Sequence, residues 1–195
     1  MRPLFLSPNT LTISRIVLTF FFILAMCAEG FIFKLLGAII FFLASFTDYY
    51  DGYIAKKHKM VSDFGKLMDP IADKFLMLSA FLVFVKMGIV PVIAFLIIFG
   101  REVFITFMRL YAKHKGHILA AEKFGKYKTV SQVFCSGAIL IYVVLRSADS
   151  TNSWSDLTIS RWQEFIDFTI MVAVLMTLAS GLSYYVNNKQ VFRPQ

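Results

Sequence analysis

The chain has 195 residues, of which 58% are apolar and only 16% are charged, and its formal net charge is +8. Average soluble domains are about 45–50% apolar and about 25% charged, so the composition excludes an ordinary soluble domain and predicts an integral membrane protein. The apolar residues form continuous runs rather than alternating with polar ones, which predicts an all-α protein.

Turn-forming and polar residues divide the apolar runs into six expected membrane spans, each close to the roughly 20 residues that cross a bilayer. The expected bounds are about 11–29, 32–55, 64–85, 91–112, 129–146 and 163–186. Gly88 and Pro91 predict the tight turn before the fourth span. Tyr184 and Tyr185, at the end of the sixth, are expected interface anchors. The sequence therefore predicts one all-α integral membrane domain, residues 1–195, with six transmembrane helices.

The positions of the basic residues predict the orientation of these spans. All of the twenty Lys and Arg residues except four fall on the side of the two termini, and the exceptions are Lys34, Lys86, Arg146 and Arg161. Membrane proteins concentrate Lys and Arg on the cytoplasmic side, so both termini are expected there. The same rule accounts for the positive net charge without a nucleic-acid ligand.

Four aspartates stand beside the apolar runs in the stretch DYYDGYIAKKHKMVSDFGKLMDPIADK, residues 48–74. Asp48 and Asp51 are three residues apart, and Asp69 and Asp73 are four apart, so each pair shares one face of a helix. A carboxylate at the bilayer centre costs about 2.5–3.5 kcal/mol on the insertion scale. Four of them near a membrane therefore indicate a function, and all four are expected at its cytoplasmic edge.

A divalent cation explains the four carboxylates most simply. The short loop between the second and third spans would bring the two pairs together, where their charges would repel unless a cation neutralised them. Oxygen ligands without His or Cys indicate Mg²⁺, Mn²⁺ or Ca²⁺ rather than zinc. Two ions would suit phosphoryl transfer. Gly52, Ala55 and Gly65 keep the surrounding surface small, either for a ligand or for helix packing.

The stretch resembles the signature of the CDP-alcohol phosphotransferases, D-x2-D-G-x2-A-R-x8-G-x3-D-x3-D. Seven positions match it, and they are Asp48, Asp51, Gly52, Ala55, Gly65, Asp69 and Asp73. Lys56 stands where the pattern has Arg, which keeps the charge but loses the planar fork for phosphate. Neighbouring Lys57 could share the role.

This resemblance implies a role for each matched residue. Asp48, Asp51 and Asp69 would hold metal, while Asp73 would hold the second ion and act as the general base. The ions implied are Mg²⁺ or Mn²⁺, two in number. The expected site for the CDP-lipid comprises Asp48, Gly52, Ala55, Lys56 and Gly65.

Three further stretches resemble the bacterial phosphatidylglycerophosphate synthase branch of the family: PNTLTISR (8–15), GREVFITFMR (100–109) and AAEKFGKYKT (120–129). That branch implies a homodimer in the bacterial cytoplasmic membrane, with a cytoplasmic active site. It would transfer the phosphatidyl group from CDP-diacylglycerol to sn-glycerol 3-phosphate and release CMP. The alternatives are a sister enzyme with another acceptor, such as phosphatidylglycerol, serine, inositol phosphate or choline, and a cation channel or transporter.

An acceptor that carries a phosphate needs a basic pocket. Arg101, Arg109, Lys126 and Lys128 lie at or near expected cytoplasmic helix ends, and Arg suits bidentate contacts to phosphate. They are therefore the expected ligands of the acceptor phosphate, although basic residues there also anchor helices or contact anionic membrane lipids. Glu102 is expected to be the ion-pair partner of Arg101.

Overall fold

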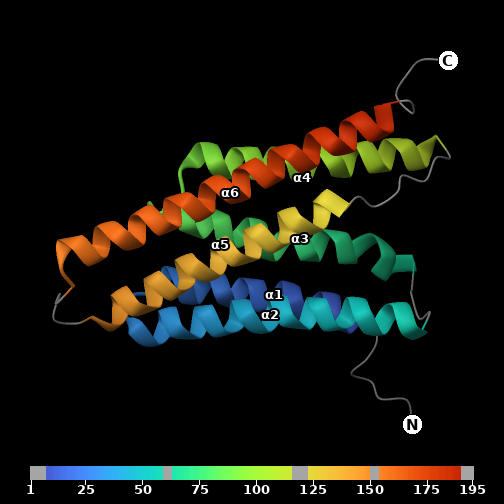
Figure 1. The fold of residues 1–195 in the computed structure, drawn as a ribbon. Coiled ribbons are helices and arrows are strands. Elements are labelled where there is room, and N and C mark those ends of the chain that lie inside the picture. Colours follow the sequence, from blue (N-terminus) through green and yellow to red (C-terminus); the bar gives the residue numbers. More distant parts are fainter. Residues whose placement is uncertain (1–7, 59–62, 116–122, 150–153, 190–195) are drawn as a thin grey trace, which may run out of the picture. The chain divides into compact units, whose positions relative to one another are not determined.

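The computed structural model describes the backbone of residues 8–58, 63–115, 123–149 and 154–189. Within them, side chains are described at 13–46, 74–112, 115, 124–149 and 154–189. The described residues form six α-helices and no strand. The helices are α1 (Pro8–Cys27), α2 (Phe31–His58), α3 (Asp63–Lys86), α4 (Val92–His114), α5 (Lys123–Ala148) and α6 (Asp156–Asn188) (Figure 1). The predicted all-α fold is confirmed.

Helix α6 begins earlier than the sequence pattern predicted. Ser155 caps it, since its side-chain oxygen accepts a hydrogen bond from the backbone N–H of Thr158 at 3.2 Å. Such a cap satisfies one of the unpaired N–H groups of the first turn. The predicted start at residue 163 followed the apolar run alone and missed the polar first turns. Helix α5 likewise begins before its apolar part, at Lys123.

The chain divides into two compact units. The first comprises α1, α2, most of α3 and the end of α5. In it α1 and α2 lie side by side (Figure 1). Gly30 joins them with a φ of +102°, a conformation that glycine adopts without steric cost. Lys34 Nζ donates to the carbonyl of Met26 at 2.5 Å and so pairs one of the last carbonyls of α1.

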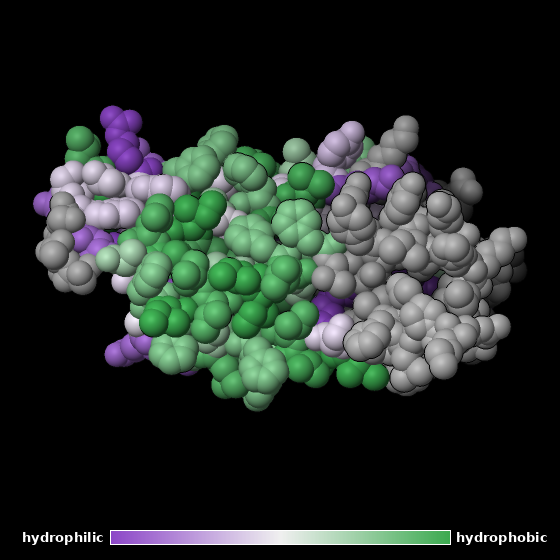
Figure 2. Space-filling view, turned by 90° about the horizontal axis from the view of Figure 1, so that it is seen from below, coloured by the Kyte–Doolittle hydropathy of each residue, from purple (hydrophilic) through white to green (hydrophobic). Residues whose placement is uncertain are grey.

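The core of this first unit is largely apolar, although Arg15 and Thr19 are also buried in it, and its outer surface is apolar as well. The rings of Phe22 and Phe41 are completely buried, with centroids 5.7 Å apart. Large apolar side chains such as Phe20, Ile32 and Leu43 point outward. Figure 2 shows hydrophobic side chains over most of the described part of the face on which α1 and α2 lie. A surface of this kind suits contact with lipid.

The second unit comprises α4, the first part of α5 and α6. The turn that precedes α4 has Gly88 at a φ of +75°, with its N–H donating to the carbonyl of Val85 at 2.9 Å. Helices α4 and α6 lie side by side and run in the same direction (Figure 1). Ile105 and Met108 of α4 pack with Tyr184 of α6 in the core.

Tyr184 corrects one expectation from the sequence. Tyr184 is only 2% exposed. It is therefore a core residue of the second unit and not an interface anchor. Adjacent Tyr185 is 49% exposed. The two lie on different sides of α6 because neighbouring helical residues are about 100° apart.

Among the described residues, two helical stretches are long and apolar enough to cross a membrane: Phe124–Ala148 and Asp156–Asn188. Two shorter stretches, Ile13–Cys27 and Phe31–Phe46, are also apolar. These two long helices agree with a membrane-associated protein.

Candidate functional site

The four aspartates occupy the two helices that the sequence predicted. Asp48 and Asp51 lie in the C-terminal half of α2, and Asp69 and Asp73 lie in the first half of α3. Their side chains are outside the described residues, as are those of Ala55 and Lys56. Gly52 of α2 and Gly65 of α3 also lie in the part of these helices whose side-chain surroundings are not described. The roles assigned to these positions therefore remain predictions.

Within the described residues, no group of three or more His, Cys, Asp and Glu side chains could hold a metal ion. The side chains of residues 47–73, which include the four aspartates, lie outside the described residues. The carboxylates at 48, 51, 69 and 73 remain the predicted donor set for Mg²⁺ or Mn²⁺, because both ions prefer oxygen ligands.

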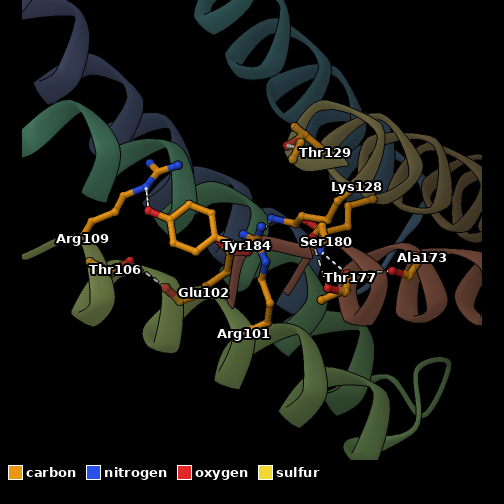
Figure 3. Close-up of polar contacts among 12 residues, drawn as sticks. Arg101, Glu102, Thr106, Arg109, Lys128, Thr129, Ala173, Thr177, Ser180 and Tyr184 are labelled. Atoms are coloured by element: carbon orange, nitrogen blue, oxygen red, sulfur yellow. Dashed lines mark hydrogen bonds and ion pairs between the residues drawn. The ribbon is translucent and has the colours of Figure 1, made fainter. Parts of the chain in front are cut away.

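A buried ion cluster joins α4 and α5 in the second unit (Figure 3). Arg101 Nη1 donates to Glu102 Oε1 at 2.9 Å, and Lys128 Nζ donates to the same oxygen at 2.5 Å. The side chains of Arg101, Glu102 and Lys128 are 13%, 7% and 8% exposed. The expected Arg101–Glu102 pair is confirmed. The contact of Lys128 with the same carboxylate was not predicted.

Arg101 runs close to α6, and its Nε has no hydrogen-bond partner among the described residues. Its Cγ lies 3.4 Å from the position that a Cβ would occupy at Gly181 of α6, so the stem of Arg101 runs close to that helix. Its Nε is buried and has no hydrogen-bond partner among the described residues. A buried N–H without a partner is costly, and a ligand with an oxyanion could satisfy it.

Arg109 contacts α6 in another way. Its Nε donates to the hydroxyl of Tyr184 at 3.3 Å, and its guanidinium carbon lies 5.5 Å from the centre of that ring (Figure 3). Arg109 itself is exposed.

Lys126, the fourth predicted phosphate ligand, is exposed on α5 and takes no part in the ion cluster. The structure thus brings together two of the four predicted basic residues, Arg101 and Lys128.

A row of buried polar residues on α6 was missed in the sequence. Gln132 of α5 donates to Thr177 Oγ1 at 3.0 Å, and Thr169 donates to Cys135 Sγ at 3.6 Å. The buried positions of α6 are Ile166, Thr169, Ile170, Ala173, Thr177, Ser180 and Tyr184. Apart from the adjacent Thr169 and Ile170, these positions are three or four residues apart, which is the helical period. The pattern of small polar residues could therefore have indicated this packing face.

The cluster has the chemistry of an oxyanion site. Two cations meet one carboxylate in a mostly buried position, and the charges of these three side chains add up to +1. Guanidinium and ammonium groups in such surroundings bind phosphate strongly, because their hydrogen bonds are charge-assisted.

Comparison with known proteins agrees with the resemblance seen in the signature. A model of the CDP-alcohol phosphatidyltransferase family matches residues 5–179. A relative from Bacillus subtilis is 32% identical over 198 residues, covering 95% of this chain and 96% of its own. One from Rickettsia felis is 33% identical over 185 residues, with the same coverage. One from Mycoplasma pneumoniae is 37% identical over 160 residues, covering 81% of this chain and 67% of its own.

Each of these three relatives is named a CDP-diacylglycerol–glycerol-3-phosphate 3-phosphatidyltransferase. The matched region includes all four aspartates, the five helices α1 to α5 and the greater part of α6. The chain belongs to the CDP-alcohol phosphatidyltransferase family.

Proposed function

We propose that the chain is a phosphatidylglycerophosphate synthase, which transfers the phosphatidyl group of CDP-diacylglycerol to sn-glycerol 3-phosphate and releases CMP. The observation that carries this proposal is the likeness, over 95% of the chain, to several relatives that share the name of that enzyme. The family signature in residues 48–73 supports the same phosphatidyl transfer. The product enters the synthesis of anionic phospholipids.

The reaction forms one P–O bond and breaks another. The primary hydroxyl of glycerol 3-phosphate attacks the β-phosphorus of the CDP-lipid, and the bond from that phosphorus to the CMP oxygen breaks. Asp73 accepts the proton of the attacking hydroxyl. The side chains that hold the reactants in line contribute most, because phosphoryl transfer depends chiefly on positioning and charge stabilisation.

The carboxylates of Asp48, Asp51, Asp69 and Asp73 are the proposed ligands of two Mg²⁺ or Mn²⁺ ions. Such ions, when bound, neutralise the diphosphate and the departing CMP. Gly52, Ala55 and Gly65 leave room for the CDP group, and Lys56 supplies a positive charge beside it. The family resemblance supports each assignment.

The acceptor phosphate is proposed to bind Arg101 and Lys128, with Arg109 at an exposed position of the same unit. The buried Nε of Arg101 supports this assignment, because it is a charged donor without a partner among the described residues. Lys126 is exposed and suits a contact with the incoming acceptor or with anionic lipid heads.

The proposal also includes the arrangement in the membrane. The chain would form a single domain with six membrane spans, and both termini and the active site would lie on the cytoplasmic side. The protein would be a homodimer in the bacterial inner membrane. The distribution of basic residues supports the orientation. The two long apolar helices support membrane insertion. The homodimer follows from the family resemblance.

A direct test measures the release of CMP from CDP-diacylglycerol by the purified protein in mixed micelles. Release should require both glycerol 3-phosphate and either Mg²⁺ or Mn²⁺. Equal release with phosphatidylglycerol, serine or inositol phosphate as acceptor would assign the chain to another branch of the family. Mass spectrometry of the lipid product identifies the acceptor independently.

A further inference from the structure

The proposed reaction gives the carboxylate of Glu102 no direct role, yet this buried group holds two cations from two helices. Its Oε1 accepts hydrogen bonds from Arg101 Nη1 at 2.9 Å and from Lys128 Nζ at 2.5 Å. Buried ion pairs often stabilise a fold no better than apolar residues of similar size. The arrangement of the two cations is therefore the better explanation for Glu102.

Electrostatics shows what the carboxylate does to its partners. A guanidinium and an ammonium that meet at one oxygen would repel each other strongly in a mostly buried place. Glu102 lies between them, which allows the two cations to lie close together. The charges of these three side chains add up to +1, which favours an incoming anion.

Geometry shows which part of Arg101 remains for that anion. A guanidinium can present a second edge, formed by Nε–H and an N–H of one terminal nitrogen, to a bidentate oxyanion. Glu102 takes Nη1, and Nε is buried without a partner among the described residues. The stem of Arg101 runs close to α6, since a Cβ at Gly181 would lie 3.4 Å from its Cγ.

We infer that Glu102 is a positioning residue: it holds Arg101 through Nη1 and Lys128 through Nζ, so that the Nε edge of Arg101 and the ammonium of Lys128 meet one phosphate oxyanion together. The inference rests on the proposed function, in which glycerol 3-phosphate carries that phosphate. The diphosphate of the lipid donor has the same chemistry, so the experiment has to separate the two.

The test uses the full-length protein with Glu102→Gln, which keeps the size of the side chain and an accepting oxygen but removes its charge. The KM for glycerol 3-phosphate should rise about tenfold, while kcat and the KM for CDP-diacylglycerol stay within about twofold of the wild type. Glu164→Gln, at an exposed position of α6, is the matched control and should change neither KM. A rise in the KM for CDP-diacylglycerol instead would place the donor phosphate at the cluster and overturn the inference.

Two further variants separate positioning from a merely structural role. Glu102→Asp retains the charge and should raise the KM for glycerol 3-phosphate less than Glu102→Gln. In a Lys128→Gln background, Glu102→Gln should have a smaller effect than in the wild type, because residues that act together are not additive. A lower unfolding temperature with unchanged KM values for both substrates would show that Glu102 only stabilises the fold.

Titration with glycerol 3-phosphate gives a readout that does not depend on turnover. Its affinity should fall by the same factor as the KM rises in Glu102→Gln. An inactive wild type that binds glycerol 3-phosphate, with an affinity that Glu102→Gln lowers, would overturn the proposed reaction and keep the inference. An active wild type with a KM unaffected by Glu102→Gln would overturn the inference and keep the reaction.

Discussion

Arg109 of α4 donates its Nε–H to the hydroxyl of Tyr184 of α6 at 3.3 Å. The tyrosine is buried, in a core cluster with Ile105 and Met108, whereas Arg109 is exposed. A buried aromatic residue therefore orients an exposed cation. With Nε engaged, the edge formed by the two terminal nitrogens of Arg109 is the one that suits a bidentate phosphate.

Tyr184→Phe tests whether this orientation matters for catalysis. The substitution keeps the ring and its contact with the guanidinium but removes the hydroxyl that accepts from Nε. A hydrogen bond contributes about 0.5–1.5 kcal/mol net, so the KM for glycerol 3-phosphate should rise about two- to tenfold. Initial rates at varied concentrations of this substrate measure the effect, and kcat should change little.

Tyr185→Phe is the control for that experiment, because it removes the same hydroxyl from the adjacent, half-exposed position. Its KM for glycerol 3-phosphate should match the wild type. Equal KM values in both tyrosine variants would show that the bond to Arg109 does not contribute to binding of the acceptor.

Gly37 of α2 should be necessary for the close approach of α1. A Cβ at this position would lie 2.8 Å from Sδ and 3.0 Å from Cγ of Met26, and the side chain of Met26 is almost fully buried. Gly37→Ala should therefore destabilise the protein by about 1–3 kcal/mol. Unfolding in detergent, followed by circular dichroism, measures the loss.

Gly100→Ala provides the comparison, since a Cβ at Gly100 of α4 would meet no atom within 4 Å. Both substitutions gain the same helix propensity, about 1 kcal/mol, so their difference reports the contact with Met26 alone. Equal stability of the two variants would mean that the thioether of Met26 moves aside without cost.

The sequence predicted the helices well because each depends on a local pattern. Apolar runs, the turn at Gly88 and the helical spacing of the aspartates are all visible within a few neighbouring residues. The Arg101–Glu102 pair was predictable for the same reason, since its members are adjacent. The start of α6 was missed because its first turns are polar, although Ser155 gave a capping signal.

Contacts between residues far apart in the chain could not be predicted from the sequence. Lys128 meets Glu102 from 26 positions away, and Arg109 meets Tyr184 from 75 positions away. No periodic pattern joins such residues, because the packing of α4 with α5 and α6 decides which of them meet. Tyr184 shows the consequence: its place at the end of an apolar run suggested an interface anchor, and packing placed it in the core.

Asp73 is predicted to be the general base. Asp73→Asn keeps the size of the side chain but cannot accept the hydroxyl proton, so kcat should fall by about 10²–10⁴. Binding of CDP-diacylglycerol should be largely retained, and Asp167→Asn, at an exposed position of α6, should have wild-type activity. An unfolded Asp73→Asn protein would instead indicate a structural carboxylate.

Removal of divalent ions is predicted to abolish turnover by the wild type. A chelator should stop the release of CMP, and Mg²⁺ or Mn²⁺ should restore it, because the four carboxylates form an oxygen-only donor set that suits these ions. Zinc should not substitute, since it prefers His and Cys ligands. Turnover that persists after exhaustive chelation would contradict the proposed metal site.

Lys56 is the one signature position at which this chain differs from its family pattern. A lysine offers phosphate a point charge, whereas an arginine offers a planar fork with two parallel N–H donors. Lys56→Arg should therefore lower the KM for CDP-diacylglycerol, by about two- to fivefold, and leave the KM for glycerol 3-phosphate unchanged. Lys86→Arg makes the same chemical change at the opposite end of α3 and should alter neither value. An unchanged KM for CDP-diacylglycerol in Lys56→Arg would show that charge alone suffices at this position, with Lys57 as the neighbouring cation that could share the contact.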